Sequence, residues 1–297
     1  MTARRSCLSV PGSSEKMLAK SRTLAADELV IDLEDSVAPA AKAEARARVT
    51  DVIARRRTGE HSLAVRVNGP ATPWCHRDVI DVITGAGDAL GSLVVPKVES
   101  PGELEFVDRL AGMVEQEIDR RAPVALQALV ETATGLRNIH AIAQASPRLE
   151  TLIVGYADLS ASLGLPLGSQ NSGGHWQYVQ ESVLVAARAA GLQVIDGPYL
   201  TIEDHDGFRV SAQRARAMGY DGKWALHPTQ IDLLNQLFAP TEEELARARA
   251  VLDALETGER EADRGALMLD GSMIDEASRK LAAQVIARAA ASGAGGA

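Results

Sequence analysis

The sequence contains few aromatic residues, only two cysteines and no long apolar run. Aromatic side chains make up 3% of the 297 residues, so Ala, Val, Leu and Ile must fill most of the core. Cys7 and Cys75 show no metal-binding or redox spacing. No stretch approaches the roughly 18 apolar residues of a membrane span, and no signal-peptide segment follows Met1. We therefore expect a soluble, cytoplasmic protein.

An excess of positive charge is also absent. The net charge of −9 and the pI near 5.3 argue against a nucleic-acid or membrane-surface binder. Cations nevertheless gather near the first two predicted strand ends, and each either lies on a solvated helix face or contacts an anionic ligand. These cations are Lys16, Lys20, Arg22, Lys42, Arg46 and Arg48.

Short apolar runs alternate with helix-like segments along most of the chain. The runs are continuous rather than alternating, as is typical of strands buried on both faces. Eight such runs favour an α/β fold of the (β/α)8 type, a TIM barrel, over an open doubly wound sheet. The runs are residues 7–11, 29–33, 63–67, 92–96, 125–130, 152–155, 193–195 and 223–226.

The character of the sequence changes after Gly258. Residues 1–257 complete the eight units, so we expect them to form the catalytic barrel. Residues 258–297 are expected to form a C-terminal helical lid or arm that packs on a neighbouring subunit, with a disordered end. The Gly-, Ser- and Asn-rich stretch 164–174 predicts a mobile loop after the sixth strand.

Carboxylates stand at the ends of several predicted strands, and in a (β/α)8 barrel these ends form the active-site face. The acids are Asp32, Glu34, Asp35, Glu131, Asp158 and Asp196. Oxygen ligands without a Cys or His cluster suit Mg²⁺, with Mn²⁺ as a substitute. Glu131 and Asp158, one βα unit apart, could hold such an ion. The alternative for each is a structural ion pair, for example with Arg66 or Lys97.

Three further residues at strand ends have both a functional and a structural interpretation. Arg66 lies inside an apolar run, so it needs either a substrate oxygen or a salt bridge to Asp32 or Glu34. His227 could be a general base, a phosphate contact or a core histidine, and we favour the core because no acid is close in sequence. Gly155 either lets backbone amides approach a ligand or forms an ordinary turn.

Together the motifs resemble the citrate-lyase-β-like (CitE-like) branch of the HpcH/HpaI aldolase family, the stand-alone acyl-CoA lyases. They occur in the same order and cover roughly residues 5 to 290. The matching stretches are SVPG at 9–12, VIDLEDSV at 30–37, VRVN at 65–68, VPKVES at 95–100, VETATG at 130–135, GYADL at 155–159, ALHPTQ at 225–230 and GSMID at 271–275.

The resemblance implies that Glu131 and Asp158 hold Mg²⁺ and that Arg66 binds the thioester or enolate oxygen. It implies that Asp275 enters the site as acid or base from a neighbouring subunit of a homotrimer or hexamer. The predicted catalytic residues are Arg66, Asp275, Glu34 and Asp35. The predicted substrate and CoA contacts are Lys16, Lys20, Lys42, Arg66, Gly155, Ala157 and His227. Many members have Gly-Ala-Glu-Asp at 155–158, so Tyr156 and Ala157 are expected to change the floor of the oxoacid site.

The expected activity is reversible Claisen-type cleavage of a 3-hydroxyacyl-CoA, such as malyl-CoA or citramalyl-CoA, into an acyl-CoA and a small 2-oxoacid. Mg²⁺ stabilises the alkoxide from which the carbon–carbon bond breaks, Arg66 stabilises the enolate and Asp275 transfers the proton. The alternatives are a malyl-CoA thioesterase, a CoA-independent 2-oxoacid aldolase and a non-catalytic CoA-binding protein. No nucleic-acid or membrane partner is expected.

Overall fold

The computed structural model describes residues 2–55, 62–166, 176–262 and 266–292. The chain divides into two compact units, Arg4–Asn235 on the one hand and Gln236–Ala297 with Met1–Ala3 on the other. Residues 167–174 of the predicted mobile loop and the tail 293–297 lie outside the described residues. No helix in the described ranges is long and apolar enough to cross a membrane.

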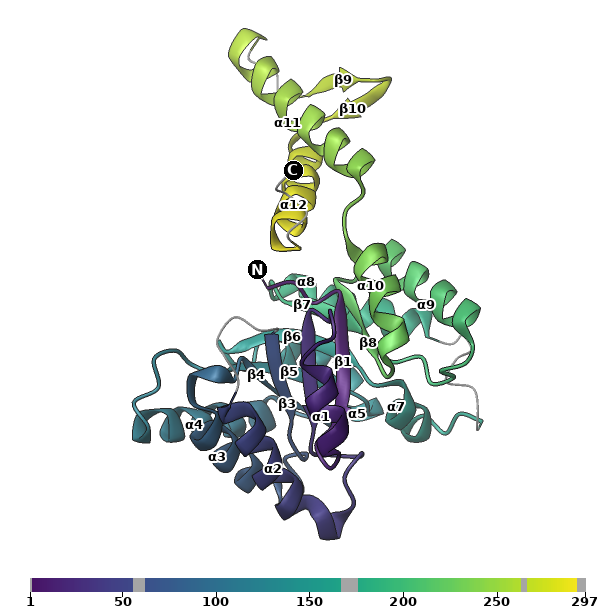
Figure 1. Cartoon of the computed structure of the whole chain (residues 1–297). Coiled ribbons are helices and arrows are strands. Elements are labelled where there is room, and N and C mark those ends of the chain that lie inside the picture. The colour runs from purple at the N-terminus through teal and green to yellow at the C-terminus, as the bar shows by residue number, and fades with distance from the viewer. Residues whose placement is uncertain (1, 56–61, 167–175, 263–265, 293–297) are drawn as a thin grey trace. The chain divides into compact units, whose positions relative to one another are not determined.

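The first unit is a closed barrel of eight parallel strands in chain order, β1 to β8 (Figure 1). The barrel prediction is therefore confirmed. The strands are β1 Ser6–Pro11, β2 Glu28–Asp32, β3 Ser62–Arg66, β4 Ser92–Val95, β5 Ala125–Val130, β6 Leu149–Val154, β7 Gln193–Asp196 and β8 Gly222–Ala225. Each coincides with a predicted run, and β6 begins three residues earlier because Leu149 also pairs with β5.

Helices follow the strands and surround the barrel (Figure 1). The longer ones in this unit are α2 Lys42–Ala54, α3 Cys75–Ala86, α4 Pro101–Glu117, α8 Gln177–Ala189 and α9 His205–Met218. The short ones are α1 Glu15–Ser21, η1 Pro39–Ala41, η2 Gly87–Ala89, α5 Ala133–Arg137, α6 Ile139–Ile142, α7 Tyr156–Ser162 and η4 Pro228–Gln230. Helix α10, Ile231–Phe238, spans the division between the units.

The barrel interior is layered, and its middle layer is apolar. One side chain from each strand forms this layer: Cys7, Val30, Ala64, Val94, Leu129, Ile153, Ile195 and Trp224. Successive strand residues point to opposite faces, so residues two positions away in either direction also face inward. This periodicity places Asp32, Arg66 and Glu131 at the carboxyl end of the barrel, above the apolar layer.

A buried polar cluster closes the opposite end of the barrel. Arg4 Nε lies 2.9 Å from Glu28 Oε1. Gln127 Nε2 donates to both Glu28 oxygens, at 3.0 and 3.1 Å, and to Ser92 Oγ at 2.8 Å. Active sites of this fold lie at the carboxyl ends of the strands, so a buried network at the amino end serves stability rather than catalysis.

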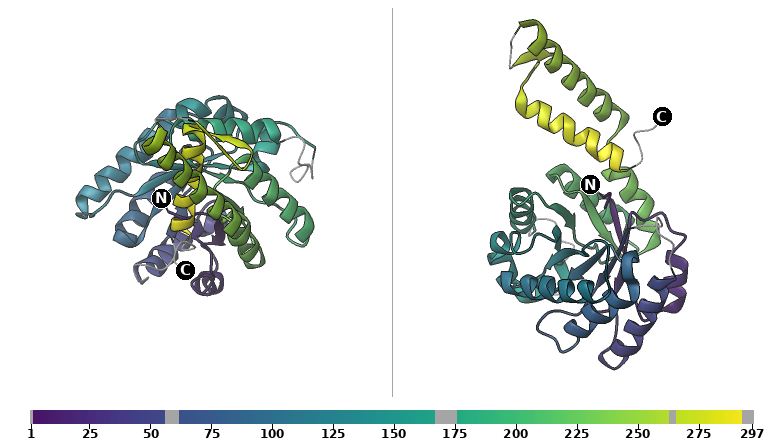
Figure 2. Two further views of the ribbon diagram at one scale, coloured as in Figure 1. Left: turned by 90° about the horizontal axis from the view of Figure 1, so that it is seen from above. Right: turned by 90° about the vertical axis from the view of Figure 1, so that its left-hand side faces the viewer.

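In the second unit the structure describes two helices and a hairpin after the end of α10. Helix α11, Glu242–Ala262, packs beside α12, Glu276–Ala291, as Figure 2 shows. Between them β9, Leu267–Leu269, and β10, Ser272–Ile274, pair antiparallel around a tight turn in which Asp270 and Gly271 both have positive φ. Ala248, Val251, Leu255, Ile274 and Ala282 form its core.

The division between the units differs from the predicted boundary at 257/258, which falls inside α11. Helix α11 continues through Gly258 to Ala262. A Cβ at this position would lie 2.4 Å from Leu267 Cδ1, so the glycine lets the hairpin pack closely against α11. The whole of α11 therefore belongs to the C-terminal unit, together with the predicted lid.

Candidate active site

Arg66 is held in place by Asp32, its neighbour across the β2–β3 ladder. The guanidinium donates from Nε to Asp32 Oδ1 and from Nη2 to Asp32 Oδ2, both at 2.7 Å. Burial works to raise the pKa of Asp32, but the hydrogen bonds and charge of Arg66 prevail and lower it. The predicted salt bridge therefore exists, and it fixes the plane of the guanidinium while leaving Nη1 outside this bidentate pair.

Glu34 contacts two cations at the mouth of the barrel. Its Oε1 is ion-paired with Lys97 Nζ, and its Oε2 lies 3.0 Å from Arg66 Nη1 without an aligned hydrogen bond. Burial raises the pKa of Glu34 despite these charges. Asp35 is more exposed, with Oδ2 at 3.9 Å from Arg66 Nη1. Both predicted acids thus lie beside Arg66.

Lys42 anchors the loop that carries Glu34. From α2 its buried ammonium donates to the carbonyl oxygens of Leu33 at 2.9 Å and Glu34 at 2.7 Å, and lies 5.4 Å from the centre of the Trp74 ring. These contacts give Lys42 a structural role in shaping the site. The predicted contact between Lys42 and CoA therefore has no support from this geometry.

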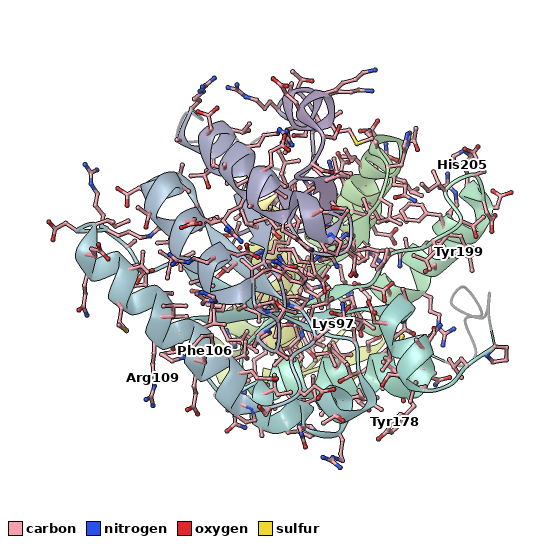
Figure 3. All side chains as sticks on the ribbon, turned by 90° about the horizontal axis from the view of Figure 1, so that it is seen from below. Lys97, Phe106, Arg109, Tyr178, Tyr199 and His205 are labelled. Atoms are coloured by element: carbon pink, nitrogen blue, oxygen red, sulfur yellow. The ribbon has the colours of Figure 1, made fainter. Side chains whose placement is uncertain are left out.

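Lys97 lies at the centre of the acid cluster. From the sequence it was expected only as an alternative ion-pair partner of Glu131 or Asp158. It follows β4 and has a left-handed backbone, with φ of 53°. Its backbone N–H donates to Glu131 Oε1 at 2.8 Å, and its Nζ lies 3.6 Å from Asp35 Oδ1 and 3.7 Å from Asp158 Oδ2. Figure 3 shows Lys97 toward the centre of this end of the barrel, whereas Arg109 and Tyr178 lie at its periphery. The only sequence signal for this role was its position after the fourth strand.

Glu131 is a buried carboxylate with little compensation for its charge. It is 2% exposed, and within the described parts of the chain no lysine or arginine side chain is ion-paired with it. Burial, followed by the charge of Glu34, raises the pKa of Glu131 to about 8. Such a group needs either a proton or a bound cation.

Gly155 provides the space that Glu131 occupies. A Cβ at Gly155 would lie 2.5 Å from Glu131 Cβ and 2.7 Å from Glu131 Oε2. Real Cβ contacts are not this short, so a larger residue would push the carboxylate away. Glycine is required here because the Glu131 side chain fills the space of a Cβ. Neither the approach of a ligand nor an ordinary turn, the two interpretations from sequence, included this reason.

Asp158 lies in the first turn of α7, with 37% of its side chain exposed. It is close enough to Glu131 for its charge to contribute to the raised pKa of that residue. The described residues include no group of three or more His, Cys, Asp or Glu side chains arranged for a metal. A two-carboxylate site suits Mg²⁺, which keeps several water or substrate oxygens in its octahedral shell.

The charge balance also fits a cation. Asp32, Glu34, Asp35, Glu131 and Asp158 meet at this end of the barrel. Arg66 and Lys97 are ion-paired with all of these acids except Glu131. Glu34 Oε2 is buried, lies 3.0 Å from Arg66 Nη1 and accepts no hydrogen bond from any residue that the structure describes. The excess of negative charge and this unsatisfied oxygen are the features that a divalent ion would neutralise.

Tyr156 does not form the floor of this site, contrary to the expectation from sequence. Its ring is buried against Trp176, with ring centres 4.8 Å apart, and its hydroxyl hydrogen-bonds to Asp196 and Gln180. Asp196 is next to the inward-facing Ile195 and therefore points out toward the helices. Tyr156 and Ala157 are the two positions that differ from the Gly-Ala-Glu-Asp of many members. Of these, only the exposed Ala157 remains a candidate for the floor of the oxoacid site.

The predicted ligand contacts outside the acid cluster lie on exposed surfaces. Lys16 and Lys20 are exposed on α1, which follows β1. His227 is also exposed, so the favoured core interpretation is wrong. Its Nδ1 lies 2.9 Å from Thr229 Oγ1 and caps η4, because the chain turns at Pro228 instead of entering the core.

Asp275 belongs to the C-terminal unit, where it caps α12. Its Oδ1 accepts from the backbone N–H groups of Ala277 at 3.0 Å and Ser278 at 3.1 Å. These bonds fix the carboxylate at the start of the helix. Its catalytic role stays a prediction.

The fold and the cluster of acids around Arg66 define a class of enzymes. The family model of the HpcH/HpaI aldolase/citrate lyase family matches residues 5–228, and the chain belongs to this family. The family prediction is therefore confirmed.

Individual relatives cover nearly the whole chain. It is 36% identical over 294 residues to the L-malyl-CoA/beta-methylmalyl-CoA lyase of Cereibacter sphaeroides, covering 94% of this chain and 92% of that protein. It is also 36% identical over 293 residues to the (3S)-malyl-CoA thioesterase of the same species, covering 99% and 97%. The solved structure of CitE from Mycobacterium tuberculosis with magnesium, acetoacetate and coenzyme A is 30% identical, with a TM-score of 0.77 and coverage of 97% and 98%.

Proposed function

We propose that this protein is a Mg²⁺-dependent carbon–carbon lyase that cleaves or forms a 3-hydroxyacyl-CoA of the malyl-CoA type. The observation that carries the proposal is the buried Glu131 carboxylate, which lies near Asp158 and is not ion-paired with any lysine or arginine side chain that the structure describes. Relatives named as malyl-CoA lyases and a magnesium- and CoA-bound structure support the same metal and substrate class.

Glu131 and Asp158 would hold the ion, which supplies Lewis-acid stabilisation to the oxygens of the 2-oxoacid. Arg66 would face the thioester oxygen with Nη1, because Asp32 occupies Nε and Nη2, whereas Nη1 has only the ion contact with Glu34 Oε2 at 3.0 Å and no aligned hydrogen bond to it. The substrate hydroxyl would lose its proton to water and become the 2-oxo group as the carbon–carbon bond breaks. The electron pair of that bond moves into the thioester, and the guanidinium stabilises the charge on the thioester oxygen. Glu34 orients both Arg66 and Lys97.

We propose that Asp275 donates the proton to the enolate carbon, or removes it in the reverse direction, from the C-terminal unit of a neighbouring subunit. This unit exposes Met268 and Met273 at 69% each and Leu281 at 65%. An apolar groove of about 480 Å³ adjoins Met273 and Leu281. Exposed apolar surface of this kind is typical of an interaction site. A homotrimer or hexamer should therefore be found by light scattering, and a monomer would contradict this arrangement.

A malyl-CoA thioesterase is the second candidate, because a relative with that name covers 99% of the chain at 36% identity. The same metal and arginine could serve hydrolysis of the thioester. The two functions differ in the bond that breaks, so their products separate them. A lyase forms glyoxylate and acetyl-CoA from malyl-CoA, whereas a thioesterase forms malate and free CoA.

The experiment incubates the purified protein with L-malyl-CoA, with Mg²⁺ or with EDTA, and identifies both products. We expect glyoxylate and acetyl-CoA in the sample with Mg²⁺ and neither product in the sample with EDTA. Asp158→Asn should lose turnover. Malate without glyoxylate would favour the thioesterase. Binding without turnover on malyl-, methylmalyl-, citramalyl- and citryl-CoA would contradict both enzymes and favour a CoA-binding protein.

A further inference from the structure

Lys97 contacts both of the acids proposed as metal ligands. Its backbone N–H donates to Glu131 Oε1 at 2.8 Å, and its ammonium lies 3.7 Å from Asp158 Oδ2. The backbone at this residue is left-handed, with φ of 53°, a conformation that persists only where its surroundings hold it. One residue therefore orients the first ligand and neutralises the second.

Burial disfavours the charged form of Lys97, but its hydrogen bond to Glu34 and the nearby acids raise its pKa above the usual value. The side chain thus keeps a positive charge within the acid cluster. A cation held against Asp158 competes electrostatically with any other cation bound there.

The contacts of Lys97 differ from those of a lysine fixed in the fold. Lys223 is 0% exposed, and its ammonium is held by Asp196 Oδ2 at 2.5 Å and by the Gly197 carbonyl at 2.6 Å. The Lys97 side chain is 35% exposed, and its contacts with Asp35 and Asp158 are 3.6 and 3.7 Å long. Because the Lys97 ammonium is partly exposed and its contact with Asp158 is longer than its contact with Glu34, it can leave Asp158 while it stays paired with Glu34.

We propose that Lys97 is a built-in counter-cation that occupies the electrostatic place of the metal in the metal-free enzyme and lowers the affinity for Mg²⁺. It is a positioning residue, and the proposal rests on the metal site of the proposed function. When Mg²⁺ binds, the ammonium moves away from Asp158, while the Lys97 amide continues to orient Glu131. The enzyme thereby keeps its acid cluster assembled without metal, at the cost of weaker metal binding.

The test is the affinity of the full-length, metal-free protein for Mn²⁺ alone, measured by electron paramagnetic resonance of the free ion. Lys97→Met should bind Mn²⁺ about tenfold more tightly or better, which is the effect of one unit charge ~6 Å from a divalent ion even at the dielectric constant of water. Lys97→Arg keeps the charge and should stay close to wild type. Arg109→Met removes the same charge from the exposed face of α4, at the periphery of the barrel (Figure 3), and should change the affinity by less than about twofold.

The sign of the change separates this role from a structural one, because a damaged site binds metal more weakly. Unchanged or weaker Mn²⁺ binding by folded Lys97→Met would overturn the proposal. If wild type still bound Mn²⁺ and Asp158→Asn did not, the proposed function would nevertheless stand. Absence of Mn²⁺ binding in both wild type and Lys97→Met would overturn both. Circular dichroism checks folding, and Lys97→Gln carries the same expectation should the Met variant not fold.

Discussion

Metal binding should release a proton from Glu131. In the metal-free protein burial raises the pKa of this carboxyl from 4.5 to about 8, so near neutral pH it is mostly protonated. A metal ligand must be ionised, so the ion and the proton compete for the same oxygens. Affinity should therefore rise with pH until the pH exceeds the raised pKa and should be nearly constant above it.

The size of the effect follows from the pKa. A carboxyl group with a pKa of about 8 is about 90% protonated at about pH 7, so each ion bound should release about 0.9 proton there and about 0.1 at about pH 9. The same competition makes the apparent affinity at about pH 6 roughly 50-fold weaker than at about pH 8. A carboxyl group with the ordinary pKa would release almost no proton and show no such change.

Calorimetric titration of Mg²⁺ or Mn²⁺ in two buffers with different heats of ionisation measures the number of protons released. Glu131→Gln should lose tight metal binding. The control Glu44→Gln removes an exposed carboxylate paired with Arg48 on α2 and should leave both affinity and proton release unchanged. Two results would refute the assignment of Glu131 as a ligand that is protonated before the metal binds. They are a release below about 0.2 proton per ion at about pH 7, and a metal affinity that is independent of pH from about 6 to 8.

Three further changes test other parts of the account. Gly155→Ala should weaken Mn²⁺ binding about 10- to 100-fold by displacing Glu131, whereas Gly102→Ala, whose added Cβ would lie 4.0 Å from Ser100 Oγ, an ordinary contact, should not. Glu28→Gln should lower the free energy of unfolding by about 3 to 5 kcal/mol in urea titrations, because it breaks a buried ion pair, yet leave KM unchanged because the cluster lies at the other end of the barrel. Asp275→Asn should lower kcat by roughly 10²- to 10⁴-fold with unchanged Mn²⁺ affinity, and since asparagine also caps helices, α12 should persist in circular dichroism spectra. Equal Mn²⁺ affinity in the two glycine variants, a changed KM in Glu28→Gln, or normal turnover by Asp275→Asn would each contradict the corresponding step.

The sequence predicted the barrel and the position of its acids because both follow from local pattern. Each strand is a short apolar run, and in a parallel barrel all strands end at the same face. Glu131 and Asp32 could thus be assigned to one region without knowledge of any contact. The resemblance to a family added the roles of these residues, which spacing alone left open between metal binding and ion pairs.

Other features depend on tertiary contacts that no local pattern reports. Tyr156 stands where a strand passes into a helix, so the two-residue periodicity no longer tells which face its side chain takes. Lys42 was grouped with exposed cations, but carbonyl groups of the preceding loop bury its ammonium. The position of Lys97 requires a left-handed backbone, which lysine rarely adopts, and sequence gave no reason to expect it.

The most direct test of the central claim is anomalous diffraction from crystals of the protein grown with Mn²⁺. We expect one strong peak bound by carboxylate oxygens of Glu131 and Asp158 at about 2.1 Å, as for a small octahedral cation. A site without density, in which Glu131 keeps its proton and Asp158 stays with Lys97 at saturating metal, would contradict the account.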